Sequence, residues 1–141
     1  MANDINDFAR SMGIATSGLR AQAGRMRVIS ENIANAESAS PTAGGDPYRR
    51  KVPSFTSELD RALDARVVGI GKVRPDTSAF RTKHEPGNPA ADASGNVKYP
   101  NVNPLIEMTD MRDAQRSYEA NLNVISATRR MLALTLNIIK S

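Results

Sequence analysis

Few residues in this chain are suited to chemistry. The single histidine, His84, precedes Glu85, and such a pair could act in proton transfer. The pair is followed directly by Pro86 and Gly87, which indicates a turn, so a solvated loop histidine is the favoured interpretation. An enzyme that uses Glu85 or His84 is kept as a minor alternative.

Two other patterns could bind phosphate. Residues 69–72 (Gly-Ile-Gly-Lys) lack the four-residue spacer and the Lys-Ser/Thr pair of a phosphate-binding loop, so they are interpreted as strand. The basic runs Arg49-Arg50-Lys51 and Arg129-Arg130 have no aromatic stacking platform beside them and are typical of a solvated surface. A basic nucleic-acid-binding protein remains an alternative from another class, and it predicts association that weakens steeply with salt.

Composition excludes further classes of site. The chain has 141 residues, a formal net charge of +4, no cysteine and one histidine, which rules out disulfides, thiolate metal sites and the usual zinc sites. The sequence therefore predicts no catalytic residue, no cofactor, no metal and no small-molecule substrate. The start, Met1-Ala2-Asn3-Asp4, carries acid where a secretory signal carries basic residues, so no cleaved signal peptide is expected.

Proline separates the chain into three regions. All eight prolines lie between residues 41 and 104, which leaves two helix-permitting arms around a turn-rich middle. The predicted fold class is α+β, with long coiled-coil-type helices on both sides of a small β-rich module. The predicted ranges are 1–38 for the first helix, 39–103 for the β module and 104–141 for the second helix, with the two helices paired as one inner domain.

Each arm carries an apolar heptad repeat. The steps of three and four follow Ile5, Phe8, Met12, Ala15, Leu19, Gln22, Met26, Ile29 and Ile33 in the first arm, and Met108, Met111, Gln115, Tyr118, Leu122, Ile125, Arg129, Leu132, Leu136 and Ile139 in the second. Such a narrow stripe needs a partner helix, either within the chain or in a helical polymer. Gln22, Gln115 and Arg129 interrupt the stripes and would fix their register through polar partners.

Local signals refine the elements. Asn103 before Pro104 predicts the start of the second helix, which would run about 55 Å to Lys140. Three glycines, Gly13, Gly18 and Gly24, should weaken the first helix by about 1 kcal/mol each. Short strands are predicted at residues 48–55, 66–74 and 96–99, and a helical turn or two at 56–65.

Several motifs together resemble one known family. Residues 30–38 (Ser-Glu-Asn-Ile-Ala-Asn-Ala-Glu-Ser) followed by Tyr48, and residues 85–92, 99–103 and 117–122, are similar to the bacterial flagellar axial proteins of the rod, hook and hook-associated family. The motif positions are Asn32, Ala34, Asn35, Ser38 and Tyr48. The nine residues 39–47 that precede Tyr48 are similar to an insertion found in a proximal rod subunit, and other rod subunits of the family are the nearest alternative.

The resemblance implies a structural subunit of the periplasm-spanning rod of the flagellar basal body, which transmits torque. It implies export by the flagellar type III apparatus without a cleaved signal, and copies of itself and other rod subunits as partners. The expected assembly interface comprises the apolar members of the two stripes: Phe8, Met12, Leu19, Met26, Ile29, Ile33, Met111, Tyr118, Leu122, Ile125, Leu132, Leu136 and Ile139. Neither nucleic acid nor a small molecule is expected as a partner.

Overall fold

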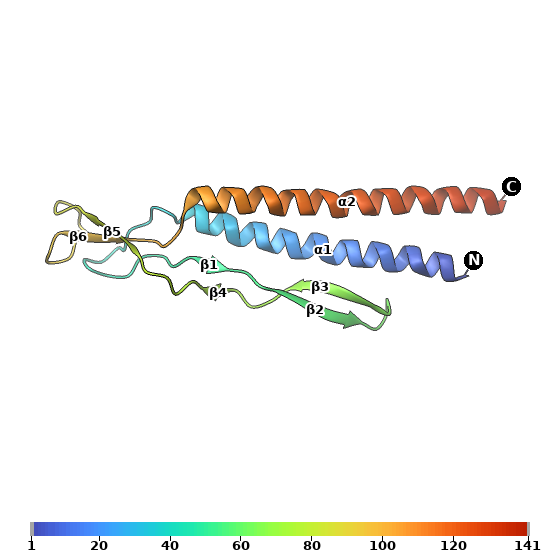
Figure 1. Cartoon of the computed structure of the whole chain (residues 1–141), viewed down its shortest axis with the longest axis horizontal. Coiled ribbons are helices and arrows are strands. Elements are labelled where there is room, and N and C mark those ends of the chain that lie inside the picture. Colours follow the sequence, from blue (N-terminus) through green and yellow to red (C-terminus); the bar gives the residue numbers. More distant parts are fainter. Residues whose placement is uncertain (1, 141) are drawn as a thin grey trace. The chain divides into compact units, whose positions relative to one another are not determined.

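Two long helices open and close the chain in the computed structural model, which describes residues 2–140 and the side chains of residues 6–138 (Figure 1). The first, α1, spans Ala2–Ala34, and the second, α2, spans Pro104–Lys140. At the start of α2 the Asn103 side-chain oxygen accepts from the backbone N–H of Leu105 at 3.1 Å. The predicted N-cap at Asn103 is thus confirmed.

Six strands lie between the helices. They are β1 (Lys51–Val52), β2 (Phe55–Asp60), β3 (Ala65–Ile70), β4 (Arg74–Pro75), β5 (Arg81–His84) and β6 (Asn96–Tyr99). They form three separate two-stranded antiparallel sheets, β1 with β4, β2 with β3 and β5 with β6. The α+β class predicted from the sequence is confirmed, with two long helices on both sides of the β region.

The prediction of a helical turn at residues 56–65 was wrong. Half of this segment is β2, which pairs from Phe55 opposite Ile70 to Asp60 opposite Ala65. Between the strands the Asp60 carboxylate accepts from the backbone N–H groups of Ala62 and Leu63, and Asp64 adopts a left-handed conformation with φ of 48°. Pairing with a valine-rich strand and a side-chain-stabilised turn override the weak helical preference of the segment.

Two of the three strand predictions were correct in position but too long. Residues 48–55 contain only β1 and the first residue of β2, and residues 66–74 contain most of β3 and the start of β4. Residues 96–99 form β6 as predicted, whereas its partner β5 was not predicted.

The residues group into two compact units. Unit 1 comprises Met1–Met26, Ser54–Lys72 and Asp113–Ser141, and unit 2 comprises Arg27–Pro53 and Val73–Arg112. The boundaries cut through both helices and assign the β2–β3 hairpin to unit 1. The pairing of the two whole helices as one inner domain therefore stays a prediction.

The two units differ in what they bury. Unit 2 buries Ile29, Val97 and Val102, each at most 3% exposed. Among the described side chains of unit 1, the buried ones are Ala15, Ala21, Ala114 and Thr128, none larger than threonine. Unit 1 therefore gains little apolar burial within one chain.

Candidate functional site

Asn32, near the end of α1, is the centre of a buried polar junction in unit 2. Its side-chain amide donates to the Lys51 carbonyl at 2.8 Å and to the Glu107 carboxylate at 3.0 Å. Its side-chain oxygen accepts from the Tyr48 hydroxyl at 2.8 Å and from the Lys51 backbone N–H at 2.9 Å. A side-chain amide has two donors and two acceptor sites, so all four are used by a residue that is 1% exposed.

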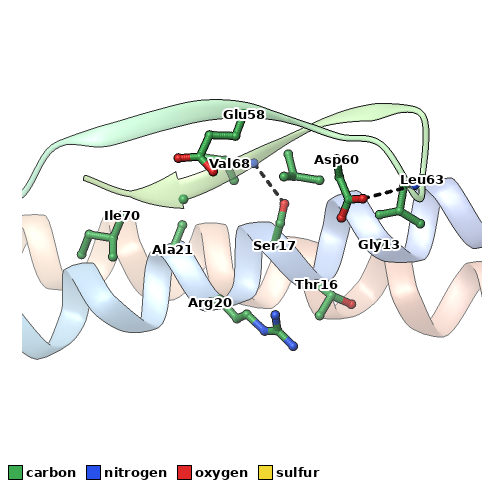
Figure 2. A pocket seen from close by; sticks show the side chains of 12 residues that line it. Gly13, Thr16, Ser17, Arg20, Ala21, Glu58, Asp60, Leu63, Val68 and Ile70 are labelled. Atoms are coloured by element: carbon green, nitrogen blue, oxygen red, sulfur yellow. Dashed lines mark hydrogen bonds between the residues drawn. The ribbon is translucent and has the colours of Figure 1, made fainter. Parts of the chain in front are cut away.

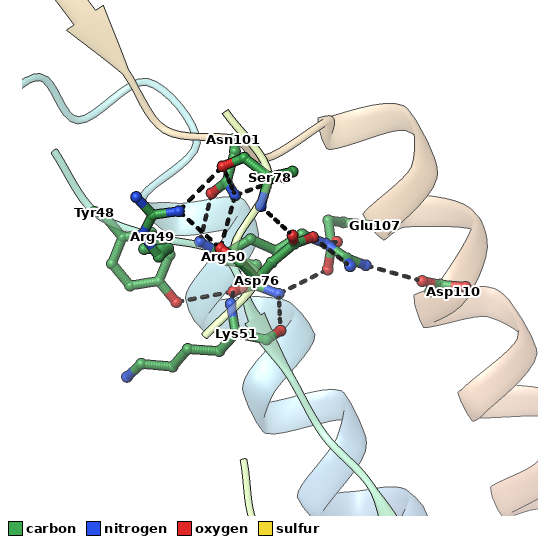
Figure 3. A network of polar contacts seen from close by, with 10 residues as sticks. Tyr48, Arg49, Arg50, Lys51, Asp76, Ser78, Asn101, Glu107 and Asp110 are labelled. Carbon is green, nitrogen blue, oxygen red and sulfur yellow. Dashed lines mark hydrogen bonds and ion pairs between the residues drawn. The ribbon is translucent and has the colours of Figure 1, made fainter. Parts of the chain in front are cut away.

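Glu107, in the first turn of α2, is fully buried at 0% exposure and is paired with Arg50 (Figure 3). Its second oxygen accepts from Arg50 Nε at 2.6 Å. The Arg50 guanidinium also lies 3.5 Å from Asp76 and 3.7 Å from Asp110. Burial lowers the pKa of Arg50, but the hydrogen bonds and charges of Glu107 and Asp76 together outweigh it, so the net shift of the pKa is upward. The pairing and the bond from Asn32 offset the cost of burying this carboxylate.

The segment of residues 48–51, which contacts both Asn32 and Glu107, is also held by Asn101. Asn101 accepts from the Arg50 backbone N–H at 2.8 Å and donates to the Asp76 carbonyl and the Ser78 hydroxyl. Burial, and then the charges of Glu31 and Glu107, raise the pKa of Tyr48 to about 12. The Tyr48 hydroxyl is therefore a neutral donor to Asn32 at physiological pH.

The junction connects two of the five motif residues, Asn32 and Tyr48. The others lie at the end of α1: Ala34 is its last residue, Asn35 donates to the Glu31 carbonyl at 2.8 Å, and the Ser38 backbone N–H donates to the Asn35 carbonyl at 3.1 Å. These three residues form the turn that leaves the helix.

The two helices contact each other in unit 1 through small residues. A Cβ atom added to Gly18 of α1 would lie 2.8 to 2.9 Å from the amide atoms of Asn121 of α2. Asn121 is one heptad after Ala114 and one before Thr128, which are 0% and 2% exposed. The contact between Asn32 and Glu107 in unit 2 lies two heptads from Gly18 along α1 and two heptads from Asn121 along α2. The buried line of α2 therefore consists of small and polar residues one position before the predicted apolar stripe.

The predicted stripe residues lie beside this line. Ala15 and Ile29 are buried, and Met108, Leu122 and Leu136 are 52%, 48% and 43% exposed. Nine apolar members are half-buried: Phe8, Met12, Leu19, Met26, Ile33, Met111, Tyr118, Ile125 and Leu132. The side chains of Ile5 and Ile139 lie outside the described residues. Of the polar interruptions, Gln22 has a buried side-chain oxygen with no partner among the described residues, and Gln115 and Arg129 are exposed.

The β2–β3 hairpin packs against another face of α1 in unit 1 (Figure 2). Arg10 donates to the Leu63 carbonyl at 2.9 Å and to the Asp64 carboxylate at 3.0 Å. Further along α1, the Ser17 hydroxyl accepts from the Val68 backbone N–H at 3.2 Å. Gly13 and Gly24 lie against Leu63 and Ile70, so these glycines mark close approaches to the hairpin.

The residues first considered for chemistry have structural contacts. His84 Nδ1 lies 3.2 Å from the Asn96 side-chain oxygen, and hydrogen bonds from Asn88 and Tyr99 lower the pKa of Glu85. Arg49 stacks 4.1 Å from the Phe80 ring centroid. In the described part of the chain, no group of three or more His, Cys, Asp or Glu side chains could hold a metal ion.

The described helices include none with the length and apolar character needed to cross a bilayer. Comparison with protein families finds two matches. Residues 12–38 match the family described as flagella basal body rod protein, and residues 93–138 match the family described as flagellar basal body rod FlgEFG protein C-terminal.

Curated relatives match almost the whole chain. A flagellar basal-body rod protein FlgC from Agrobacterium fabrum is 53% identical over 137 residues, which cover 97% of this chain and 99% of the relative. Proteins of the same name from Bacillus subtilis and Aquifex aeolicus are each 37% identical, and cover 91% and 92% of this chain and 95% of each relative.

Proposed function

Since the chain belongs to the family of flagellar basal-body rod proteins FlgC, we propose that it joins the rod through one apolar face of its two terminal helices. It is a structural subunit of the proximal rod of the bacterial flagellar basal body and assembles there with other rod components. In this proposal it transmits torque and catalyses no reaction. It binds no cofactor, small molecule or nucleic acid.

The proposed interface lies on one side of the helix pair in unit 1 and is named here the seam face. It comprises Phe8, Met12, Leu19 and Met26 of α1 with Tyr118, Leu122, Ile125, Leu132 and Leu136 of α2. Gly18 and Asn121 are the contact residues of the two helices, and Leu19 and Leu122 follow them directly in sequence. Each leucine is therefore rotated by about 100° around its helix axis from the contact residue. Because the helices run antiparallel, this rotation turns both side chains to the same side of the pair.

The observation that carries the proposal is the exposure of this apolar face. Leu122 is 48% and Leu136 is 43% exposed, in a unit whose own buried side chains are small. Covering such leucines contributes about 25 cal/mol for each Å² removed from water. Contact with neighbouring subunits would therefore supply burial that unit 1 lacks.

A charge on the seam face tests the proposal. Leu122→Asp should abolish incorporation of the subunit into basal bodies and swimming motility, because a carboxylate would be buried between subunits without a partner. Asn123→Asp adds the same charge to the next exposed residue of α2, on a different face, and should assemble normally. Circular dichroism of both purified variants checks that helix content is unchanged. Normal motility of Leu122→Asp would contradict the seam-face proposal.

We also propose that the flagellar export apparatus delivers the subunit without cleavage of a signal peptide. Family membership supports this route. Late ordering of unit 1 would fit passage through a narrow channel, because little apolar surface holds its segments together before neighbours bind.

A further inference from the structure

A second apolar line runs along α2, outside the seam face. It comprises Ala120, Val124, Ala127, Met131 and Leu134, with steps of four and three residues, and is named here the outer stripe. Val124, Met131 and Leu134 are 44%, 49% and 62% exposed. Heptad spacing on an exposed helix face is the pattern of side chains that insert between residues of a partner.

A groove of about 490 Å³ lies between α1 and the β2–β3 hairpin in the same unit (Figure 2). On the α1 side the groove is lined by residues from Gly13 to Ala21, and on the β3 side by Val67, Val68 and Gly69. From Gly13 to Ala21 the helix rises about 12 Å, and two side chains one heptad apart on a helix are about 10.5 Å apart. The groove thus has the length to hold Val124 and Met131 of a partner helix.

The charges of the two surfaces are complementary. The charged residues that line the groove are Glu58, Asp60 and Arg20, so acidic side chains outnumber basic ones. Glu58 is exposed and forms no ion pair with the described residues. Arg130 is exposed on α2, one helical turn from both Ala127 and Leu134 of the outer stripe. Exposed opposite charges of this kind steer association and fix its register more than they add affinity.

We propose that the outer stripe of one subunit packs into the hairpin groove of a second copy of this chain. The inference rests on the proposed function and adds a second contact surface to it. The proposed contact is heterologous: the stripe of one subunit enters the groove of the next, and the two surfaces share no residue. Each subunit then still offers a free stripe and a free groove, and the contact builds an open polymer.

Disulfide trapping tests the contact because the natural chain has no cysteine. A strain whose only copy of the subunit carries Val67→Cys and Leu134→Cys should give, in oxidised basal bodies, a ladder of covalent multimers of the 15.2 kDa chain. The matched control combines Val67→Cys with Leu122→Cys, which places the second thiol on the seam face of the same helix. The control should stay monomeric under the same oxidation.

A charge exchange provides the second measurement and leaves the apolar residues in place. Glu58→Arg and Arg130→Glu should each lower the trapping yield about fivefold, the equivalent of roughly 1 kcal/mol for an exposed pair, and the double variant should restore it. If the cysteine variant fails to assemble, the same single and double charge variants are scored by motility, with the same pattern expected.

The outcomes separate the two proposals. Dimers without a ladder would indicate a reciprocal two-fold contact and overturn the inference, as would equal trapping in the control or no trapping in assembled basal bodies. The seam-face proposal survives these results. Absence of the unsubstituted subunit from basal bodies would instead overturn the proposed function together with this inference.

Discussion

Asn32→Asp is the sharpest test of the buried junction because it changes hydrogen-bond donors into acceptors with almost no change of shape. The bonds from Tyr48 and from the Lys51 N–H can remain, while the second oxygen would face the Lys51 carbonyl and the Glu107 carboxylate, which now accept at 2.8 and 3.0 Å. Loss of one neutral bond and one bond to a charged group costs about 2 to 4.5 kcal/mol. For a chain of this length the melting temperature should fall by roughly 6 to 18 °C at pH 7.

The same variant should also change how the free energy of unfolding depends on pH. The introduced carboxyl would lie beside the Glu107 carboxylate in a buried site, where a second negative charge is disfavoured. The folded state therefore holds a proton on the introduced carboxyl and raises its pKa above that of the unfolded chain. Stability that requires this proton is fully present below the unfolded pKa of about 4 and is lost as pH rises through the folded pKa. Between pH 7 and pH 5 the variant should therefore gain stability, by up to about 1.4 kcal/mol for each pH unit.

Thermal unfolding followed by circular dichroism from pH 5 to pH 8 measures both effects. Asn35→Asp is the matched control, since Asn35 lies one turn away and its side chain makes one hydrogen bond, to the Glu31 carbonyl. It should lose no more than about 1.5 kcal/mol. If Asn32→Asp melts within 3 °C of the natural chain with the same pH slope, the account of the junction is wrong.

Two further predictions concern Tyr48 and the glycines of α1. The folded state raises the pKa of Tyr48 to about 12, so its contribution to stability is complete below pH 10 and is lost as pH rises toward 12. Tyrosinate absorbance should show a late titration step that Tyr48→Phe removes, and an unchanged titration would refute the burial of this phenol. Gly18→Ala should destabilise by about 1 to 3 kcal/mol, because the new Cβ meets the amide of Asn121, which is held by its bond to the Ser117 carbonyl. In Gly24→Ala the new Cβ comes closest to the flexible end of the Ile70 side chain, so this variant should be neutral or gain up to about 1 kcal/mol from helix propensity. Equal melting temperatures for the two variants would count against the close approach of Gly18 to Asn121.

The helices were predictable because their signals are local. The confinement of proline to residues 41–104 and the N-cap at Asn103 correctly indicated where α1 and α2 would form. From the sequence, the glycines of α1 were interpreted only as a cost in helix propensity. Their structural role could not be predicted because it depends on residues far away in sequence, as when Gly18 makes room for Asn121.

The junction was only half visible in the sequence. Asn32 and Tyr48 belong to a recognisable motif, but Glu107 stands in the first turn of α2, where an acidic residue is common, and nothing in the sequence marks it as a buried partner. A search for apolar repeats passes over Glu107, Ala114, Asn121 and Thr128, although they recur every seven residues. A heptad search that scores small and polar residues together would have found this line.

The division of the chain into units also determines when each can form during synthesis or secretion from the N-terminus. Unit 2 is complete once residue 112 has emerged, whereas unit 1 needs Asp113 and the residues after it as well as the first 26. The first three quarters of α1 must therefore wait for the last three quarters of α2, across almost the full length of the chain. Closing so long a loop is slow compared with local folding, so the last residues to appear set the pace at which the subunit becomes competent to bind.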